Sequence, residues 1–333
     1  MRIVLGLAAI FCAGAVAATP AGPAPGAQPF AHAQQLVDVG GRRLNLYCSG
    51  AGPVTVVFEA GSGDAGWTWQ AIQPQVARRA RACVYDRAGL GFSDPSPRKA
   101  SPHNAVGDLH ALLGKAGVKP PYVLVGHSYG GALVQLYAYR YPGEVKGLVL
   151  VEPAGEHEFE RLNAVSQGRL KMLLDMNAQV SRACLAQAEK GFAPGSALRA
   201  TCSAGYDAGG APPELAAARL AMLTSASFWR TAVAESDYDQ TSDDALRAAR
   251  RPFGDLPLVV LTRGVSPFAV PGQPQSALNK AFEEENRELH LELAKLSTHG
   301  RERVVPGAAH AIQIQQPQAV VQAVDEVLDQ AGR

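Results

Sequence analysis

One serine stands between two glycines in the pentapeptide GHSYG, residues 126–130. The apolar run Tyr122–Val125 before it is typical of a buried strand, and the residues after Gly130 are typical of a helix. A Gly-x-Ser-x-Gly turn between a strand and a helix strains the backbone of the serine, and larger side chains at Gly126 and Gly130 would collide. The pattern predicts that Ser128 presents its hydroxyl for nucleophilic attack, beside a helix N-terminus that favours negative charge.

A serine hydroxyl becomes a good nucleophile when a neighbouring imidazole accepts its proton. The chain has eight histidines, and His310 lies between small residues in PGAAHAIQ, after the last predicted strand. His299 precedes that strand and would lie at the wrong edge of the sheet, whereas His127 inside the pentapeptide is expected to pack. His310 is therefore a candidate base, and a structural loop histidine is the alternative.

The composition bounds the kind of protein that carries these residues. The chain has 333 residues, of which 47% are apolar, and α/β folds of this length often form one core with an insertion. Charged residues make up 18%, the formal net charge is +1, and there is no basic run. Near neutrality gives no long-range attraction to phosphates, so we expect no nucleic-acid partner.

The N-terminus has the features of an export signal. Arg2 precedes an uncharged apolar run that ends in the small residues Ala15–Ala17, which fit a signal-peptidase site. We assign residues 1–18 to a cleaved signal peptide and the Pro/Ala/Gly-rich residues 19–29 to a disordered linker. The apolar run is too short and too rich in Ala and Gly for stable membrane insertion. The expected location is the periplasm or the medium; a buried N-terminal helix and a lipoprotein anchored at Cys12 are the alternatives.

Four cysteines remain after the predicted signal peptide: Cys48, Cys83, Cys184 and Cys202. An even number in an oxidising compartment favours two disulfides, with three possible pairings. Free buried thiols are the alternative. The spacings C-x-x-C and H-E-x-x-H are absent, so we expect no metal site.

Strand and helix patterns alternate over most of the chain, which predicts a mostly parallel sheet covered on both faces. We expect a hairpin around residues 40–41, a helix over residues 68–80, and a helix that begins after an N-cap at Ser101. Residues 154–254 interrupt the alternation with helical patterns alone. We interpret that block as a helical cap inserted into the sheet domain; a separate helical domain is the alternative.

Six stretches together resemble the α/β-hydrolase superfamily, over about residues 35 to 330. They are VVFEAGSGDAGWTW, CVYDRAGLGFSDPSPR, YVLVGHSYGGAL, GLVLVEPAG, LPLVVLTRG and VVPGAAHAIQIQQPQAVVQAV. The resemblance implies an α/β fold with an eight-stranded sheet, mostly parallel with its second strand antiparallel. It also implies a core of residues 30–154 and 255–333, with a helical cap over residues 155–254 after the sixth strand.

The resemblance assigns His310 as the base of a catalytic triad but leaves the acid away from its usual place. The loop after the seventh predicted strand, TRGVSPFAVPGQPQSALNKAF, has no carboxylate. Some members of the superfamily place the acid after the sixth strand, where this chain has Glu152. Alternatives are Asp237, Asp239 and the cluster Glu283–Glu285, whereas Glu156, Glu158 and Glu160 belong to the entrance of the cap.

Acyl transfer also needs hydrogen-bond donors for the oxyanion. The resemblance implies the backbone N–H of Tyr129 and a second N–H from the loop EAGSG after the third strand. We choose Ser62 for the second donor, with Gly63 as the alternative. Glu59 stands where most relatives have a histidine, and we expect it to hold the shape of the loop.

Other residues of these motifs have less specific roles. Asp86, Arg87, Gly89 and Gly91 belong to a loop that is scaffolding in the superfamily. Four aromatic residues are candidates for the substrate pocket, although core packing or the interface between cap and sheet would use the same residues: Trp67, Trp69, Phe228 and Trp229.

The strand order of the superfamily also suggests the disulfides. The second strand lies beside the fourth and runs opposite to it, so the end of the second, at Cys48, meets the start of the fourth, at Cys83. Cys184 and Cys202 both fall in the cap and would close a loop there.

These features predict an exported serine hydrolase that cleaves carboxylic esters of small to medium size without a metal or organic cofactor. Haloalkane dehalogenases and epoxide hydrolases use an aspartate in place of Ser128. Aminopeptidases, lactonases, thioesterases, cofactor-free haloperoxidases and C–C bond hydrolases remain alternatives; Glu235 and Asp237 are weak support for the first. A non-catalytic binding protein on a hydrolase scaffold is the alternative of another class. The sequence leaves the oligomeric state open.

Overall fold

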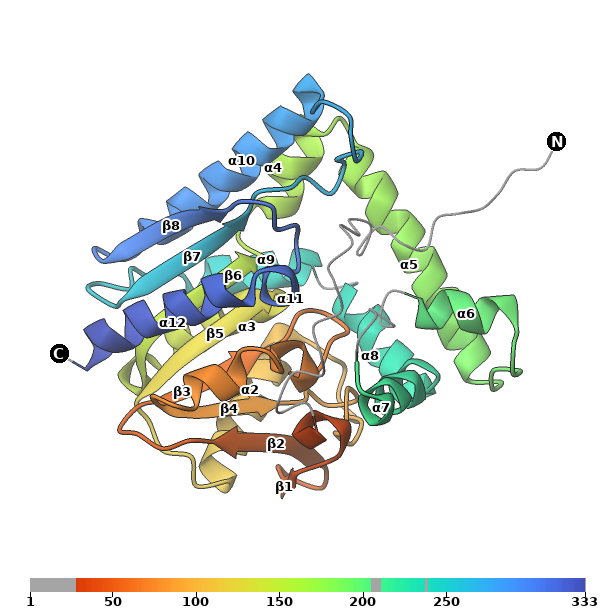
Figure 1. The fold of residues 1–333 in the computed structure, drawn as a ribbon, viewed down its shortest axis with the longest axis horizontal. Coiled ribbons are helices and arrows are strands. Elements are labelled where there is room, and N and C mark those ends of the chain that lie inside the picture. Colours follow the sequence, from red (N-terminus) through yellow and green to blue (C-terminus); the bar gives the residue numbers. More distant parts are fainter. Residues whose placement is uncertain (1–27, 205–210, 237–238, 333) are drawn as a thin grey trace.

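The computed structural model describes residues 28–204, 211–236 and 239–332. Their centre is one eight-stranded sheet with the order β1-β2-β4-β3-β5-β6-β7-β8 (Figure 1). β2 runs antiparallel to both β1 and β4, and the other pairs are parallel, which confirms the predicted sheet. The strands are β1 (Gln35–Asp38), β2 (Arg43–Ser49), β3 (Thr55–Glu59), β4 (Arg81–Tyr85), β5 (Tyr122–Ser128), β6 (Val145–Pro153), β7 (Leu258–Arg263) and β8 (Gly300–Val305).

The predicted signal peptide and most of the predicted linker lie outside the described residues. The last two linker positions, 28 and 29, belong instead to a short 3₁₀ helix, η1 (Gln28–Ala31). Phe30 of this helix is buried and its ring lies edge-on to Tyr47 of β2. The linker assignment was therefore too long at its C-terminal end.

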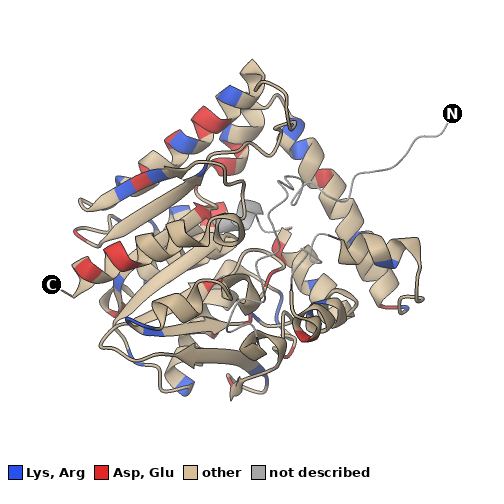
Figure 2. Cartoon of the chain, in the orientation of Figure 1, with Lys and Arg blue, Asp and Glu red and all other residues tan. Residues whose placement is uncertain are grey.

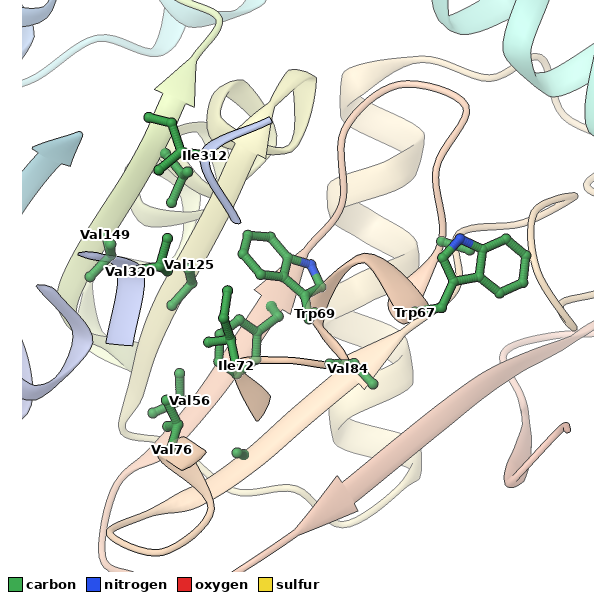
Figure 3. Packing of buried hydrophobic residues seen from close by; sticks show 14 of the residues in the cluster. Val56, Trp67, Trp69, Ile72, Val76, Val84, Val125, Val149, Ile312 and Val320 are labelled. Atoms are coloured by element: carbon green, nitrogen blue, oxygen red, sulfur yellow. The ribbon is translucent and has the colours of Figure 1, made fainter. Parts of the chain in front are cut away.

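Both faces of the sheet are buried, because successive strand residues point to opposite sides. Val56 and Phe58 of β3 join one core cluster, while Val57 between them joins the other. The first face is covered by α1 (Gln73–Val76) and α12 (Pro317–Ala331), and Figure 3 shows part of this layer. The second face is covered by α2 (Pro102–Lys115) and α3 (Tyr129–Arg140).

One predicted helix is wrong in its extent and another is confirmed at its start. Residues 68–80 do not form one helix: η2 (Gly66–Trp69) is followed by the single turn of α1. Pro74 near the start of α1 explains the break, because proline is tolerated in the first helical turn but not inside a helix. Ser101 caps α2 as predicted, since its hydroxyl accepts a hydrogen bond from the Asn104 N–H at 3.2 Å.

Six described helices separate β6 from β7 along the chain, although these two strands are adjacent in the sheet. Figure 1 shows α5 to α8 grouped beyond one side of the sheet. Helix α9 instead packs against α3 and α2, and its Ala245 and Leu246 join the second core cluster. The division into core and cap stays a prediction. The six are α4 (Glu158–Val165), α5 (Arg169–Ala188), α6 (Ala197–Ser203), α7 (Pro213–Leu223), α8 (Ala226–Ser236) and α9 (Asp239–Ala249).

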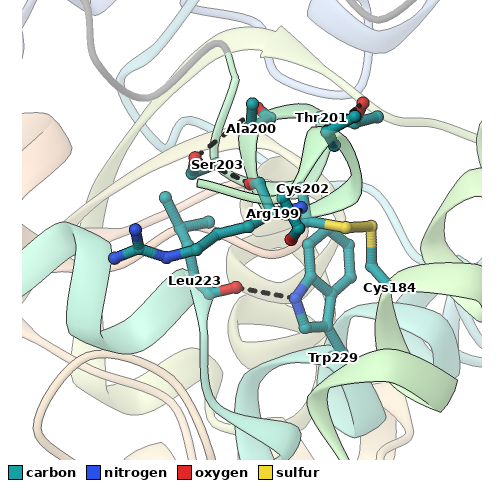
Figure 4. Close-up of a disulfide and its surroundings, with 10 residues drawn as sticks. Cys184, Arg199, Ala200, Thr201, Cys202, Ser203, Leu223 and Trp229 are labelled. Atoms are coloured by element: carbon teal, nitrogen blue, oxygen red, sulfur yellow. Dashed lines mark hydrogen bonds between the residues drawn. A yellow bond between two sulfur atoms is a disulfide. The ribbon is translucent and has the colours of Figure 1, made fainter. Parts of the chain in front are cut away.

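Both predicted disulfide pairings are confirmed. Cys48 and Cys83 are direct partners on the antiparallel strands β2 and β4, with their Cα atoms 4.0 Å apart. Cys184 and Cys202 join α5 to α6 with their Cα atoms 5.7 Å apart (Figure 4). Cross-links of this kind typically stabilise a fold by about 2–4 kcal/mol.

The C-terminal part of the molecule carries charges of both signs. Figure 2 shows Lys and Arg interspersed with Asp and Glu along β8 and α10 (Ala277–Ala294). Arg287 of α10 and Glu302 of β8 form one of these pairs, at 3.4 Å. Among the helices of the described residues, none is long and apolar enough to cross a membrane.

Candidate active site

Ser128 is the last residue of β5, and α3 begins at the next residue. Its backbone has φ 54° and ψ −124°, so the predicted strain is present. A Cβ atom added to Gly126 would lie 2.4 Å from the Gly130 carbonyl oxygen, and one added to Gly130 would lie 2.5 Å from the Glu59 carbonyl oxygen. The two glycines are therefore required by the close approach of the backbone, and the turn leaves Ser128 half-buried.

Glu152 has a strained backbone at the same edge of the sheet. It lies at the end of β6, where Pro153 is the register partner of Ser128, and its φ is 43°. Among the described non-glycine residues, positive φ occurs only at Ser128, Glu152, His157 and Gln167. Such strain costs about 1–3 kcal/mol per residue and concentrates at functional sites. Two adjacent strands thus end in strained residues with chemically useful side chains.

His310 lies in the loop between β8 and the short helix α11 (Ile312–Gln315), beside the turn that holds Ser128. The His127 Nε2–H donates to the His310 carbonyl oxygen at 3.0 Å, and the two rings are 4.8 Å apart. A Cβ atom added to Gly61 would lie 2.9 Å from His127 Nδ1 and 3.5 Å from Ser128 Cβ. His127 therefore packs between the loops that surround Ser128 and holds the His310 loop against β5.

The surroundings keep His310 neutral at ordinary pH. Burial lowers its pKa to about 4, against the opposing effect of the Glu152 carboxylate, and Arg263 and His290 lower it further. Burial and the neighbouring His310 lower the pKa of His127 to about 3. A neutral imidazole is the form that can accept a proton from a serine hydroxyl.

Glu152 is buried and remains ionised. Its Oε2 accepts the Arg263 backbone N–H at 2.6 Å, and its Oε1 accepts the Asn286 side-chain amide at 3.1 Å and a hydrogen bond from the Arg263 guanidinium. Burial would raise its pKa, but the positive charge of Arg263, with smaller effects of His290 and His310, lowers it to about 2. The carboxylate is thus held by several donors while it interacts electrostatically with His310.

Sequence reasoning missed the three residues around Glu152: Arg263, Asn286 and His290. Asn286 and His290 are both buried and lie four residues apart on α10, so they share one face of that helix. The His290 Nδ1 and Thr262 Oγ1 are 2.9 Å apart. The sequence signal that could have predicted Asn286 and His290 is a pair of polar residues at helical spacing on a buried helix face.

The alternative acids have other partners or lie outside the description. Glu283 accepts hydrogen bonds from Arg263 at 3.0 Å and 3.2 Å, on the side of the guanidinium away from Glu152. Glu285 pairs with Arg161. The side chains of Asp237 and Asp239 lie outside the described residues.

The loop after β3 contains one of the two predicted oxyanion donors. Ser62 is exposed, and the preceding Gly61 lies beside Ser128. The Gly63 N–H, our alternative donor, already donates to Glu235 Oε2 at 2.8 Å. The candidates are therefore the N–H groups of Ser62 and of Tyr129, which opens α3 at the positive end of the helix dipole.

Glu59 and the loop after β4 have structural partners. Glu59 is buried and accepts hydrogen bonds from the Tyr85 hydroxyl and from Arg87 Nη1, the latter at 2.8 Å. Asp86 accepts the N–H groups of Gly66 at 2.8 Å and Phe92 at 3.0 Å. These contacts fit the scaffolding roles that we expected.

The four aromatic candidates have different neighbours. Trp69 (Figure 3) is fully buried and packs on Phe58 with ring centroids 5.2 Å apart, whereas Trp67 donates its Nε1–H to Asp64 at 3.0 Å. Trp229 donates to the Leu223 carbonyl oxygen at 2.8 Å beside the second disulfide (Figure 4). These contacts fit a structural role, the alternative that we raised, and a role in the pocket stays a prediction. Phe228 is also buried and lies edge-on to Trp229, with ring centroids 4.8 Å apart, and its ring would lie 3.8 Å from a Cβ atom added to Gly63.

A hollow of about 260 Å³ lies between the loop after β4 and α8. Arg98, Ser101 and Arg230 are among its walls, and Ser128, His310 and Glu152 are not. Tyr129, the residue after Ser128, also lines it, so the hollow lies next to the strained end of β5. In the parts of the chain that the structure describes, no group of three or more His, Cys, Asp or Glu side chains is placed to hold a metal ion.

Residues 56–323 match the family model described as the alpha/beta hydrolase family. The match covers most of the chain, which therefore belongs to this family.

Curated relatives match shorter segments. The uncharacterized protein YqjL of Bacillus subtilis (strain 168) is 40% identical over 105 residues, which are 32% of this chain and 42% of that protein. The 2-hydroxy-6-oxo-2,4-heptadienoate hydrolase of Pseudomonas putida is 35% identical over 128 residues, 36% of this chain and 45% of the relative. The chain thus spans less than half the length of these relatives.

Solved structures match nearly the whole chain. A thermophilic esterase from Thermogutta terrifontis has a TM-score of 0.57 at 20% identity and covers 90% of this chain and 99% of its own. A meta-cleavage product hydrolase from Pseudomonas fluorescens IP01 has a TM-score of 0.59 at 18% identity, with the same coverage. At such low identity these likenesses establish the fold.

Proposed function

We propose that this hydrolase cleaves carboxylic esters of small to medium size through a triad of Ser128, His310 and Glu152. The observation that carries the proposal is the pair of strained residues, Ser128 and Glu152, at the ends of adjacent strands with His310 beside them. A strained backbone persists only where the surrounding structure enforces it. The reaction needs no metal or organic cofactor.

In the first step, Ser128 Oγ attacks the ester carbonyl carbon while its proton passes to His310. The backbone N–H groups of Ser62 and Tyr129 stabilise the oxyanion. The intermediate then expels the alcohol, which takes the proton from His310. Water attacks the acyl-enzyme with His310 again accepting the proton, and the acid leaves with Ser128 restored.

Glu152 orients His310 and stabilises the imidazolium that forms during both steps. Because Arg263 and Asn286 already hold its oxygens, the carboxylate approaches His310 in a fixed orientation. Its low pKa keeps it ionised throughout the pH range in which His310 is neutral.

Residues 1–18 are proposed to be a signal peptide that exports the protein to the periplasm or the medium. The two disulfides support this location, because disulfides form and persist in oxidising compartments. We also keep the proposed division into a core and a helical cap over residues 155–254, which would shape the pocket.

Cleavage of a C–C bond is the second candidate reaction. It is favoured by the match to the heptadienoate hydrolase and by a 2-hydroxymuconate semialdehyde hydrolase of Pseudomonas, 36% identical over 123 residues. The aminopeptidase alternative loses support, because both oxygens of Glu235 are bound to Arg87. Asp237 lies outside the described residues.

The test is release of p-nitrophenol from short- and medium-chain p-nitrophenyl esters by the mature protein and by Ser128→Ala and His310→Ala. We expect wild-type turnover and losses of about a thousandfold or more in kcat for both variants. A wild-type protein that is inert on every ester, and that takes no fluorophosphonate label at Ser128, would support a non-catalytic binding protein instead. Labelling without ester turnover would favour the C–C substrate.

A further inference from the structure

Arg87 joins the loop after β3 to the inserted helix α8. Its Nε and Nη2 donate to the two oxygens of Glu235 at 2.7 Å and 2.8 Å. Its Nη1 donates to Glu59 Oε1 at 2.8 Å and to the Ala60 carbonyl oxygen at 2.7 Å, and its Nη2 also donates to the Gly61 carbonyl oxygen at 2.7 Å. A guanidinium has five N–H donors, and these five bonds use all of them.

The network is buried and multiply bonded. The side chains of Arg87, Glu59 and Glu235 are 5%, 2% and 3% exposed. Glu235 also accepts the Gly63 N–H, so one carboxylate of α8 holds both the guanidinium and the backbone of the loop. Charges removed from water in this way persist only with such complete pairing, and their geometry is correspondingly fixed.

The bond from Arg87 to Gly61 acts directly on the predicted oxyanion donor. The Gly61 carbonyl and the Ser62 N–H belong to one peptide unit, which is planar and in the trans form. Its oxygen and hydrogen therefore point in opposite directions. Fixing the Gly61 oxygen on Arg87 fixes the direction of the Ser62 N–H, and the bond from Gly63 to Glu235 secures the next peptide.

We propose that Glu235 and Arg87 are positioning residues for the oxyanion hole: Glu235 holds Arg87, and Arg87 aims the Ser62 N–H. This inference rests on the proposed function, because the loop matters to the rate only if an oxyanion forms there. It makes α8 part of the machinery for the transition state, although neither side chain touches the reacting atoms.

The test compares Glu235→Gln and Arg87→Lys with Glu189→Gln. Glu189 pairs with Arg230 of α8 at 3.0 Å on the surface, so its variant removes an ion pair of the same helix without touching the loop. We measure kcat and KM on an ester, and the affinity for a trifluoromethyl ketone, whose adduct with Ser128 carries an oxyanion. A plain methyl ketone reports ground-state binding.

For Glu235→Gln and Arg87→Lys we expect kcat to fall about 10- to 100-fold, since a misaligned donor retains only part of its effect. KM should stay within about threefold. The affinity for the trifluoromethyl ketone should fall by the same factor as kcat/KM, and the affinity for the methyl ketone should not. Glu189→Gln should match the wild type in all four quantities.

A merely structural role gives a different result. The variants would then have a lower melting temperature, and a fluorophosphonate would label Ser128 in a smaller fraction of the molecules. The kcat per labelled site and the affinity for both ketones would be unchanged. That outcome overturns the proposal.

Amide hydrogen exchange in folded Glu235→Gln tests the loop independently of activity. We expect the Gly63 amide, which donates to Glu235 in the wild type, to exchange at least about tenfold faster than in Glu189→Gln, because the loop opens more readily without the charged anchor. Equal rates overturn the positioning role even if the ester is hydrolysed. A wild type without hydrolysis but with the exchange difference would instead contradict the proposed function and leave the anchoring intact.

Discussion

Two buried arginines, Arg87 and Arg263, flank Ser128 at similar distances across the sheet. Arg87 follows β4 and Arg263 ends β7, so each lies two strands away from β5, on opposite sides. Each guanidinium is bound by two carboxylates. Arg87 has Glu59 and Glu235 as partners, whereas Arg263 has Glu152 and Glu283.

The two clusters differ in what they hold in place. Arg87 uses its donors on two carboxylates and two carbonyl oxygens, and so fixes a loop against an inserted helix. Arg263 uses its guanidinium and its backbone N–H on Glu152, and so fixes a carboxylate that interacts with His310. A buried ion pair is weak evidence for net stability. Under the proposed mechanism, the Arg87 cluster aims an oxyanion donor, whereas the Arg263 cluster holds the acid that orients the base.

Glu152→Gln should have the largest effect of the carboxylate variants. An amide in place of the carboxylate no longer stabilises the imidazolium, so we expect kcat on p-nitrophenyl esters to fall about 10³- to 10⁴-fold. Glu59→Gln, in the other cluster, should lower kcat by about tenfold at most, because Glu59 bonds Arg87 and Tyr85. Equal losses of kcat in the two variants would contradict the different roles that we assign to the two clusters.

Replacing each arginine by methionine should lower the free energy of unfolding by different amounts in the two clusters. Arg87→Met leaves two carboxylates that are 2% and 3% exposed without their charge partner, and we expect a loss of about 3–5 kcal/mol. Arg263→Met should cost less, about 1–3 kcal/mol, because Glu152 keeps the backbone N–H of residue 263 and the Asn286 amide.

The measurement is the shift in urea midpoint at constant m-value, with Glu189→Gln as a surface control. A larger loss for Arg263→Met than for Arg87→Met would contradict this ranking.

Of the two arginines, only Arg263 should affect the pH dependence of the rate. The pKa of His310 is lowered to about 4, so His310 is neutral above that pH and loses its ability to accept the serine proton as the pH falls through it. We expect the acidic limb of kcat/KM near pH 4 rather than near the ordinary histidine value of about 6.5. Since the charge of Arg263 contributes to the lowering, Arg263→Met should move the limb towards higher pH.

Arg87→Met, measured on the same ester, serves as the control for that shift. Its cluster lies on the far side of β5, so the limb should stay where it is in the wild type even if kcat falls. A limb that moves equally in both variants would mean that the shift reflects general loosening of the structure.

The fold and part of the site could be predicted because they depend on local spacing and strand order. The elbow follows from glycine spacing and the covered sheet from alternating apolar runs, whereas the strand order and both disulfide pairings were implied by the resemblance to the α/β-hydrolase superfamily. The break at Pro74 was missed because the apolar period continues through a proline, which a helix accepts only in its first turn. Local patterns therefore predicted where the strands end and which residues lie at those ends.

The two arginine clusters could not be predicted, because their partners are chosen by tertiary packing. Glu235 is 148 residues from Arg87, and Glu152 is 111 residues from Arg263. In the sequence Glu235 was a candidate for binding a substrate amine, and Arg87 was scaffolding without a named partner. Nothing in the spacing of either residue points to the other.

Glu283→Gln should have the smallest effect and decides which carboxylate of the Arg263 cluster is the acid. Glu283 is 23% exposed, and its removal leaves Arg263 paired with Glu152, so the buried charge stays compensated. A partly solvated pair of this kind contributes about 1 kcal/mol or less to stability. We expect kcat within about threefold of the wild type, because the contacts of Glu152 with the backbone of residue 263 and with Asn286 remain. The same kinetic assay is run on Glu283→Gln and Glu152→Gln side by side. If Glu283→Gln loses about a thousandfold while Glu152→Gln stays active, the acid lies on α10, and the strain at Glu152 serves only the turn that leads out of β6.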